Sequence, residues 1–325
     1  MSFDLSCAFA TSMATPEHVA VAESLGYRRA WLYDSPALYP DVWVMLARCA
    51  DRTSTIGLGP GVLIPSLRHP MTNAAAIATL VELAGVDRVA VAVGTGFTGR
   101  FTLGQKPLRW AFVADYVRAL QGLLRGEIVE WEGAKMQMIH PEGYGAPRPI
   151  EVPFLLGAAG PKGIATAKEV GAGVFVAGAD AVPGFGHEAC LLFGTVVGDD
   201  DDLSSERVMA AAGHGAAVYY HFWFETGRSM EDLPRGQDWL AAYADIPADE
   251  RHLAIHDRHL IGLNERDRAF VTPEILQSMG ATFRPAEIRE RLAAMAASGM
   301  TEIAYQPAGP DILRELEAFA AAVRG

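Results

Sequence analysis

Cysteine, positive charge and long apolar runs are all scarce in this chain of 325 residues. Its three cysteines, Cys7, Cys49 and Cys190, lie far apart, so neither a disulfide framework nor a paired zinc motif is expected. Lys and Arg number 27 against 39 Asp and Glu, and the net charge of -12 argues against nucleic acid as a partner. We find no apolar run of about 20 residues and no positive flank at Met1 to Asp4. We therefore expect a cytoplasmic protein with no membrane partner.

The familiar catalytic motifs are also missing. The sequence has no HExxH, no nucleophile elbow and no ordering of Ser, His and Asp typical of a hydrolase. Half of the residues are hydrophobic and 20% are charged, which is typical of a well-packed soluble globule. Chemistry in such a chain is expected to come from a bound molecule rather than from a catalytic triad.

One stretch, from Ile56 to Gly96, has the pattern of a complete strand, helix and strand. The apolar run 56–64 contains several glycines and is typical of a strand that is buried on both faces. Helical spacing follows from Met71 to Ala84, with Pro70 at its start and Gly85 at its end. The run 88–93 then gives a second buried strand. A parallel pair of strands needs a crossover of about this length.

The glycines at positions 94, 96 and 99 have the spacing of a dinucleotide-binding fingerprint. That motif opens directly into a helix and has an acidic residue about 20 positions later. Here the helical pattern begins only at Pro107, and the nearest later acid, Asp115, lies inside that helix. The sequence therefore disfavours a Rossmann domain.

Strand patterns alternate with helix patterns along the rest of the chain. A small hairpin around Gly133 and a long helical insertion at about 206–280 interrupt the alternation. The sequence predicts one α/β domain over 1–325, a (β/α)8 TIM barrel with an inserted helical segment after strand 7. The insertion is interpreted as a lid or a dimer arm. The eight predicted strands are 3–10, 30–33, 56–64, 88–93, 152–156, 174–177, 189–197 and 302–305.

In a barrel the functional site lies at the carboxyl ends of the strands. The residues there are mostly glycine and alanine, which suits a large flat ligand or a phosphate. The loop from Gly157 to Gly163 opens into a helix predicted from Ile164, where free backbone N–H groups would favour a phosphate. A tight turn that needs glycine only for its geometry explains the loop equally well. The candidate residues are Asp34, Gly61, Val62, Gly94, Thr95, Gly157, Ala158, Ala159, Gly160, Gly178 and Ala179.

Several segments carry a resemblance to a known family. IGLGPGVLIPSLRHPMTNAAAIATL, the GTG at 94–96, LLGAAGPKG and the late stretch FVTPEILQSMGATFRPAEIRERLAAMAASGMTEIAYQPAG resemble the bacterial luciferase-like superfamily. The branch most similar is that of methylenetetrahydromethanopterin reductase, which uses the deazaflavin coenzyme F420. The resemblance covers most of the chain except about 206–260. It implies a homodimeric barrel that transfers a hydride at C5 of the deazaflavin to or from a small organic substrate.

The resemblance also implies roles for single residues. A cis peptide at Gly61-Val62 would back the ring system, and the 157–160 loop with Gly178 and Ala179 would hold the cofactor phosphate. Asp34 would lie near the pyrimidine edge or the substrate as the catalytic residue; the alternative is an N-cap of the next turn, and we favour the functional role. Members of this branch that oxidise alcohols have a histidine where this chain has Ser35 and a glutamate after the fourth strand, which is missing from 95–97. We therefore expect reduction of an unsaturated or imine-like substrate.

Two alternative functions stay open. FMN with oxygen, as in a luciferase-like monooxygenase, would use the same glycines, and a non-catalytic flavin-binding protein would need no acid or base.

His252, His256 and His259 would share a face if helical, but no carboxylate pattern accompanies them, so no metal site is expected. Arg68 either holds an anionic group or caps a neighbouring loop, and we slightly favour the structural role.

Overall fold

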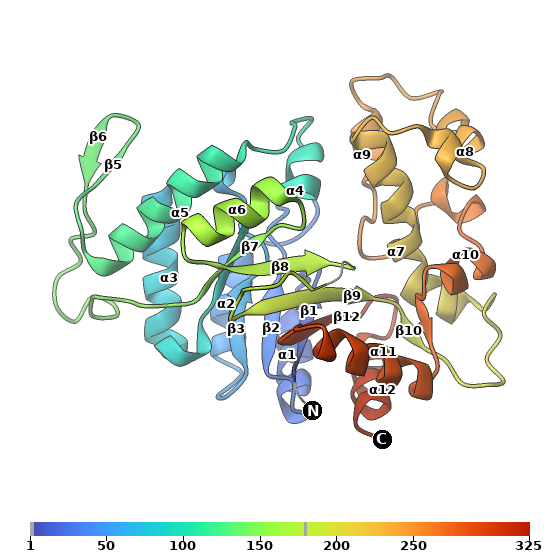
Figure 1. Ribbon diagram of the computed structural model, residues 1–325, viewed down its shortest axis with the longest axis horizontal. Coiled ribbons are helices and arrows are strands. Elements are labelled where there is room, and N and C mark those ends of the chain that lie inside the picture. The colour runs from blue at the N-terminus through green and yellow to red at the C-terminus, as the bar shows by residue number, and fades with distance from the viewer. Residues whose placement is uncertain (1–2, 179–180) are drawn as a thin grey trace.

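The computed structural model describes residues 3–178 and 181–325, and its centre is a barrel of eight parallel strands (Figure 1). Hydrogen bonds join the strands in the order β3-β2-β1-β12-β9-β8-β7-β4. Isolated bridges from Leu58 to Val89 and from Leu63 to Val93 connect β3 with β4 and nearly close the barrel. The predicted fold class is therefore confirmed. The strands are β1 (Asp4–Phe9), β2 (Arg29–Leu32), β3 (Gly57–Pro60), β4 (Val91–Gly94), β7 (Phe154–Gly157), β8 (Gly173–Ala177), β9 (Glu188–Phe193) and β12 (Glu302–Gln306).

Side chains along each strand point alternately into the barrel and out toward the helices, so both faces of the sheet are packed. Trp31 of β2 lies fully buried in the interior cluster, where its ring packs edge-on against Phe175 of β8 at 5.3 Å between centroids. Small residues such as Ala8, Ala92 and Ala304 occupy the other interior positions, which leaves room for these two rings. The opposite faces of the strands pack against the helices in a larger apolar core.

The helices around the barrel begin where the sequence offers a start signal. Pro70 opens α3, and the Asp41 carboxylate caps α2 by accepting from the backbone N–H groups of Trp43 and Val44. α5 ends at Gly126, which adopts the left-handed conformation with φ of 80°. The surrounding helices are α1 (Thr15–Ser24), α2 (Val42–Ala50), α3 (Pro70–Ala84), α5 (Trp110–Arg125), α6 (Pro161–Glu169), α11 (Pro285–Ala297) and α12 (Ile312–Arg324).

The insertion and the small hairpin lie on opposite sides of the barrel (Figure 1). The predicted hairpin around Gly133 is present as β5 (Val129–Trp131) and β6 (Ala134–Met136). The insertion is largely helical and has its own aromatic core, in which Trp239 and Tyr243 are fully buried. Its elements are α7 (Glu206–Glu225), α8 (Gly236–Ala242), α9 (Arg251–Ile255) and α10 (Pro273–Ser278).

Some boundaries differ from the sequence prediction. The strand expected over 56–64 ends at Pro60, and the strand expected over 189–197 divides at Gly194, whose φ is 134°. Beyond that break, β10 (Thr195–Val196) pairs with β11 (Thr282–Phe283) in a separate ladder. The helix predicted from Pro107 begins at Trp110, and that predicted from Ile164 begins at Pro161.

One helix was missed altogether. α4 (Phe97–Phe101) begins directly after Gly96, so the prediction that the helical pattern begins only at Pro107 was wrong. The barrel topology still excludes the Rossmann fold. In the part of the chain that the structure describes, no helix combines the length and the apolarity needed to cross a bilayer.

Candidate functional site

The carboxyl ends of β3, β4 and β7 meet around one side chain, that of Val62. The peptide bond between Gly61 and Val62 is cis, as the family resemblance predicts. A Cβ placed on Gly94 would lie 2.7 Å from Val62 Cγ2, and one on Gly157 would lie 3.1 Å from Val62 Cγ1. Val62 therefore occupies the space that side chains at both glycines would need, and the structure brings these predicted residues together.

α4 covers the neighbouring strand end. Gly96 adopts the left-handed conformation with φ of 84°, which turns the chain from β4 into α4. A Cβ on Gly99 would lie 3.0 Å from the Asp34 carbonyl oxygen, so α4 lies directly against the end of β2. Thr95, half-buried between β4 and α4, accepts a hydrogen bond from the backbone of Leu108 through its carbonyl.

Asp34 lies buried in an ion pair. Arg68 Nη1 donates to both carboxylate oxygens at 2.8 Å, and the Ile64 N–H lies 3.4 Å from Oδ2. Burial raises the pKa of Asp34, and the guanidinium of Arg68 opposes that rise only in part. Arg68 Nη2 binds Asp41 at 2.7 Å. Both branches of Arg68 are thus occupied by carboxylates of the same chain, which agrees with its predicted structural role.

The predicted phosphate loop lies at the start of α6. Gly160 is the N-cap residue, its φ of -90° is ordinary, and no side chain caps the helix. Ala158 is buried, while Ala159, Gly160 and Gly178 are exposed. A Cβ on Gly160 or Gly178 would meet nothing within 4 Å. Space and unpaired N–H groups are therefore present for an anion at this helix end. Ala179 lies outside the described residues.

The insertion reaches the same edge of the barrel through hydrogen bonds with three residues at the strand ends. Tyr39 donates to the carbonyl of His259 at 2.5 Å, and Gln306 donates to that of Leu260 at 2.7 Å. Thr98 Oγ1 of α4 lies 3.0 Å from His259 Nε2. The insertion therefore lies over the strand ends, where it can exclude water from a bound ligand.

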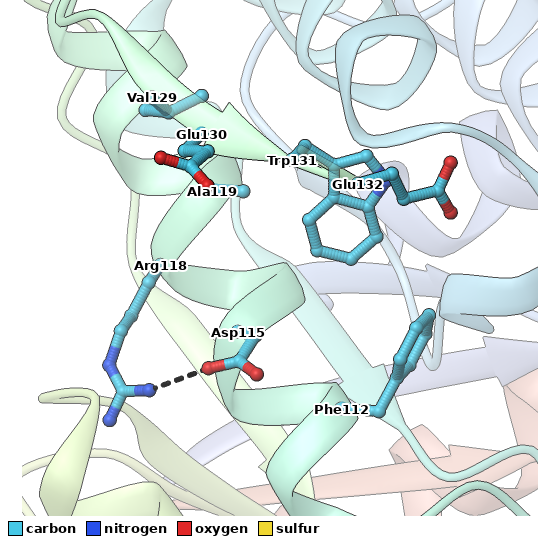
Figure 2. Close-up of a pocket in the computed structure, with 8 residues that line it drawn as sticks. All are labelled: Phe112, Asp115, Arg118, Ala119, Val129, Glu130, Trp131 and Glu132. Carbon is cyan, nitrogen blue, oxygen red and sulfur yellow. Dashed lines mark hydrogen bonds and ion pairs between the residues drawn. The ribbon is translucent and has the colours of Figure 1, made fainter. Parts of the chain in front are cut away.

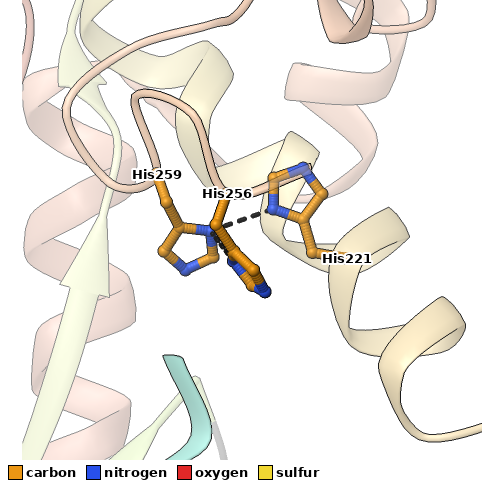
Figure 3. A group of neighbouring side chains, drawn as sticks. All are labelled: His221, His256 and His259. Carbon is orange, nitrogen blue, oxygen red and sulfur yellow. Dashed lines mark hydrogen bonds between the residues drawn. The ribbon is translucent and has the colours of Figure 1, made fainter. Parts of the chain in front are cut away.

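Four histidines of the insertion are buried, namely His214, His221, His256 and His259, and three of them gather in a group that differs from the predicted one. His221 of α7 joins His256 and His259, while His252 lies outside the group (Figure 3). His214, also on α7, is buried against Phe193 at the end of β9, and neither of its ring nitrogens makes a hydrogen bond of ordinary geometry with the described residues. Burial lowers the pKa of His214 to about 4, so its ring is neutral at neutral pH.

Sequence reasoning missed His214 and His221 because both lie in the segment that the resemblance does not cover. The one available signal was helical spacing, since positions 214 and 221 are two turns apart on a single helix.

Hollows also occur away from the strand ends. One of about 480 Å³ lies between α5 and the β5–β6 hairpin and includes Phe112, Trp131 and the Asp115–Arg118 ion pair (Figure 2). A smaller one of about 170 Å³, lined by Arg29, His187 and Glu302, lies at the amino ends of the strands. Neither hollow is lined by Val62 or Asp34. We place the candidate site at the carboxyl ends of the strands because barrels build their functional sites there.

Known proteins resemble this chain over nearly all of its length. It is 23% identical over 333 residues to a 5,10-methylenetetrahydromethanopterin reductase of Archaeoglobus fulgidus, which covers 92% of this chain and 91% of the relative. Among solved structures, the coenzyme F420 dependent tetrahydromethanopterin reductase of Methanopyrus kandleri has a TM-score of 0.67 at 20% identity, covering 99% of this chain and 98% of that one.

An oxygenating enzyme shares the fold as well. The oxygenating constituent of 3,6-diketocamphane monooxygenase of Pseudomonas putida, in complex with FMN, has a TM-score of 0.60 at 12% identity and covers 99% of this chain and 98% of its own. The model of one family, described as luciferase-like monooxygenase, matches residues 10–302. This chain therefore belongs to the luciferase-like monooxygenase family.

Proposed function

We propose that this protein is an F420-dependent oxidoreductase that transfers a hydride between reduced deazaflavin and a small organic substrate. The observation that carries the proposal is the strand-end site itself. Among the described residues that directly follow the barrel strands, Asp34 is the one carboxylate, and Arg68 occupies both of its oxygens. A site with so few available acids and bases suits an enzyme whose bound cofactor supplies the chemistry.

The residues present fit such a cofactor. Gly94 and Gly157 let the Val62 side chain pack closely against the ends of β4 and β7, and Val62 would provide an apolar contact for a flat ring. The uncapped start of α6 at Gly160, with the open Gly178 nearby in the adjacent loop, provides backbone N–H groups for a phosphate. The relatives named as reductases support the deazaflavin rather than another ligand.

Each part of the site then has a role. When bound, reduced F420 supplies the hydride. Gly61 and Val62 would support the ring, and the 157–160 loop would hold the phosphate, with Gly178 and Ala179 as further predicted contacts. α4 and the insertion exclude water from the strand ends. Asp34, fixed by Arg68, would position the cofactor or the substrate rather than remove a proton.

The substrate class follows from what the site lacks. Ser35 stands in place of the histidine of alcohol-oxidising relatives, and Thr95, Gly96 and Phe97 replace their glutamate. Reduction of an unsaturated or imine-like acceptor needs only a proton from solvent, so this direction is favoured. The proposal includes a homodimer, which light scattering after size-exclusion chromatography would test.

Two rivals remain. The FMN-bound structural relative supports an FMN-dependent monooxygenase, since FMN also offers a flat tricyclic ring and a phosphate. A non-catalytic flavin-binding protein would bind the cofactor without turnover. Consumption of reduced cofactor in the presence of candidate acceptors separates that rival from an enzyme.

Binding of F420 and of FMN, followed in parallel by quenching of cofactor fluorescence, tests the proposal. Gly160→Leu places a side chain in open space at the start of α6, so it should fold and yet block the phosphate. Gly186→Leu is the matched control, because Gly186 is equally open but precedes β9 at the opposite end of the barrel. We expect selective F420 binding that Gly160→Leu weakens and Gly186→Leu preserves. Selective FMN binding would overturn the cofactor assignment.

A further inference from the structure

Three buried histidines of the insertion direct the same ring nitrogen toward one point (Figure 3). His259 Nδ1 lies 2.9 Å from His221 Nδ1 and 3.2 Å from His256 Nδ1. One candidate ligand atom from each ring lies within 4.8 Å of the other two. All three side chains are at most 2% exposed, so bulk water does not separate the rings.

The partners of the outer nitrogens assign the tautomers of two rings. His221 Nε2 lies 2.9 Å from Asp267 Oδ2, and His256 Nε2 lies 3.3 Å from Glu225 Oε1. A carboxylate accepts a proton, so each Nε2 carries hydrogen and each Nδ1 presents a lone pair inward. The third ring has only one proton to offer to these two lone pairs. Protein hydrogen bonds alone therefore leave one inward nitrogen unsatisfied or poorly satisfied.

Asp267 is itself held firmly in place. Its Oδ1 accepts from Trp239 Nε1 at 2.8 Å and from Tyr243 OH at 2.9 Å, and its Oδ2 accepts from Asn264 Nδ2 at 2.8 Å. A buried carboxylate that orients a histidine from behind is the usual outer shell of a metal site. Glu225 repeats this arrangement for His256. Together the two carboxylates carry the charge that would balance one divalent cation.

We propose that His221, His256 and His259 bind one divalent transition metal ion through their Nδ1 atoms. Imidazole nitrogens suit zinc among such metals. Tetrahedral zinc, with bonds of about 2.0–2.1 Å, separates its nitrogen ligands by roughly 3.3 Å. The two short separations of 2.9 and 3.2 Å would widen slightly around the ion, and the longer separation, within 4.8 Å, between the ligand atoms of His221 and His256 would have to shorten.

The site would act as a clamp on the insertion. His221 lies on α7, whereas the other two ligands follow α9, so one ion would join two separate segments. His259 also contacts Thr98 of α4 and Tyr39 after β2. The ion would thus fix the insertion over the strand ends. This role is independent of which cofactor or substrate the barrel binds.

The chain offers a matched control. His252 lies on α9 beside Gly104, close in sequence to the ligands but outside their cluster. His221→Gln and His259→Gln remove a ligand, whereas His252→Gln removes a histidine of the same segment without touching the site. Asp267→Asn removes only the outer carboxylate, and loss of such a partner typically weakens metal affinity by about 10- to 100-fold.

The experiment uses the full chain after exhaustive chelation and gel filtration. Zinc titration should give one ion per chain for the wild type and for His252→Gln, raising their thermal midpoints, and none for His221→Gln or His259→Gln. Cobalt added to the wild type should give the strong visible bands of a tetrahedral site without a thiolate charge-transfer band, which excludes binding at the cysteines. The proposal is overturned if the wild type takes up no more zinc than His221→Gln, or if the cobalt spectrum is octahedral. A metal-free hydrogen-bonded histidine cluster would give both of these results.

Discussion

Replacement of Arg68 by methionine should expose how much the fold depends on the Asp34 ion pair. The substitution leaves the Asp34 carboxylate with the distant Ile64 N–H, at 3.4 Å, as its one remaining hydrogen-bond donor among the described residues. The side chain of Asp34 is only 1% exposed and that of Arg68 is 14% exposed. Removing one partner of a buried pair typically costs 3–5 kcal/mol, about 3 kcal/mol being expected here because water can enter from the partly exposed side of Arg68.

The loss of stability in Arg68→Met should depend on pH. In the native protein burial already raises the pKa of Asp34, and loss of Arg68 raises it further. A carboxyl group whose pKa is higher in the folded state carries no penalty below its unfolded pKa and the full penalty above its folded pKa. The free energy of unfolding of Arg68→Met should therefore fall more steeply than that of the wild type from about pH 5 to about pH 7.5.

Urea denaturation followed by far-UV circular dichroism at both pH values measures the effect. The double variant Asp34→Asn with Arg68→Met should recover most of the loss, since no buried charge remains. Arg125→Met is the matched control, because the exposed Arg125–Glu127 pair should contribute less than about 1 kcal/mol. A loss below about 1 kcal/mol for Arg68→Met, with no dependence on pH, would refute the reasoning.

Three further substitutions test other contacts of the site. Gly94→Ala places a methyl group 2.7 Å from Val62 Cγ2 and should cost about 1–3 kcal/mol in thermal denaturation, which an added Val62→Ala should largely restore. His214→Phe removes two buried nitrogens that make no hydrogen bond of ordinary geometry with the described residues and should raise the free energy of unfolding by about 1 kcal/mol; a loss would show that those nitrogens have partners. Thr98→Val removes the contact with His259 Nε2 and should speed amide hydrogen exchange after α9 but not in the β5–β6 hairpin; unchanged exchange would contradict a link between α4 and the insertion.

The barrel could be predicted because each of its strands has a recognisable local pattern in the sequence. Runs such as 89–93 and 152–156 are continuously apolar, and helices of ordinary length lie between the strands. α4 could not be predicted, since its five residues include Gly99 and have poor helix propensity. That helix is held by its packing against Ile64 and Asp34. The pairing of β10 with β11 likewise depends on residues 87 positions apart, beyond any local pattern.

The site was predictable in position but not in its side-chain contacts. Topology alone places Asp34, Gly94 and Gly157 at one end of the barrel, so the list of strand-end residues needed no coordinates. Which carboxylate meets which cation is a property of packing, and nothing at position 68 indicates that its guanidinium reaches Asp34. His221 and His259 are 38 residues apart and meet only because the insertion folds back on α7. The sequence shows no carboxylate pattern beside His252, His256 and His259, but the fold brings Glu225 to His256 and Asp267 to His221.

The Asp34–Arg68 ion pair and the presence of Ser35 in place of a histidine both bear on the direction of the proposed reaction. A general base for alcohol oxidation needs a free lone pair directed at the substrate. Asp34 has the position of such a base, but both of its oxygens accept from Arg68. Ser35, which replaces the usual histidine, is a hydroxyl without an adjacent base among the hydrogen bonds that the described residues form. Reduction removes this requirement, since the acceptor gains a hydride and takes its proton from solvent. The site as folded therefore favours an acceptor for hydride over an alcohol donor.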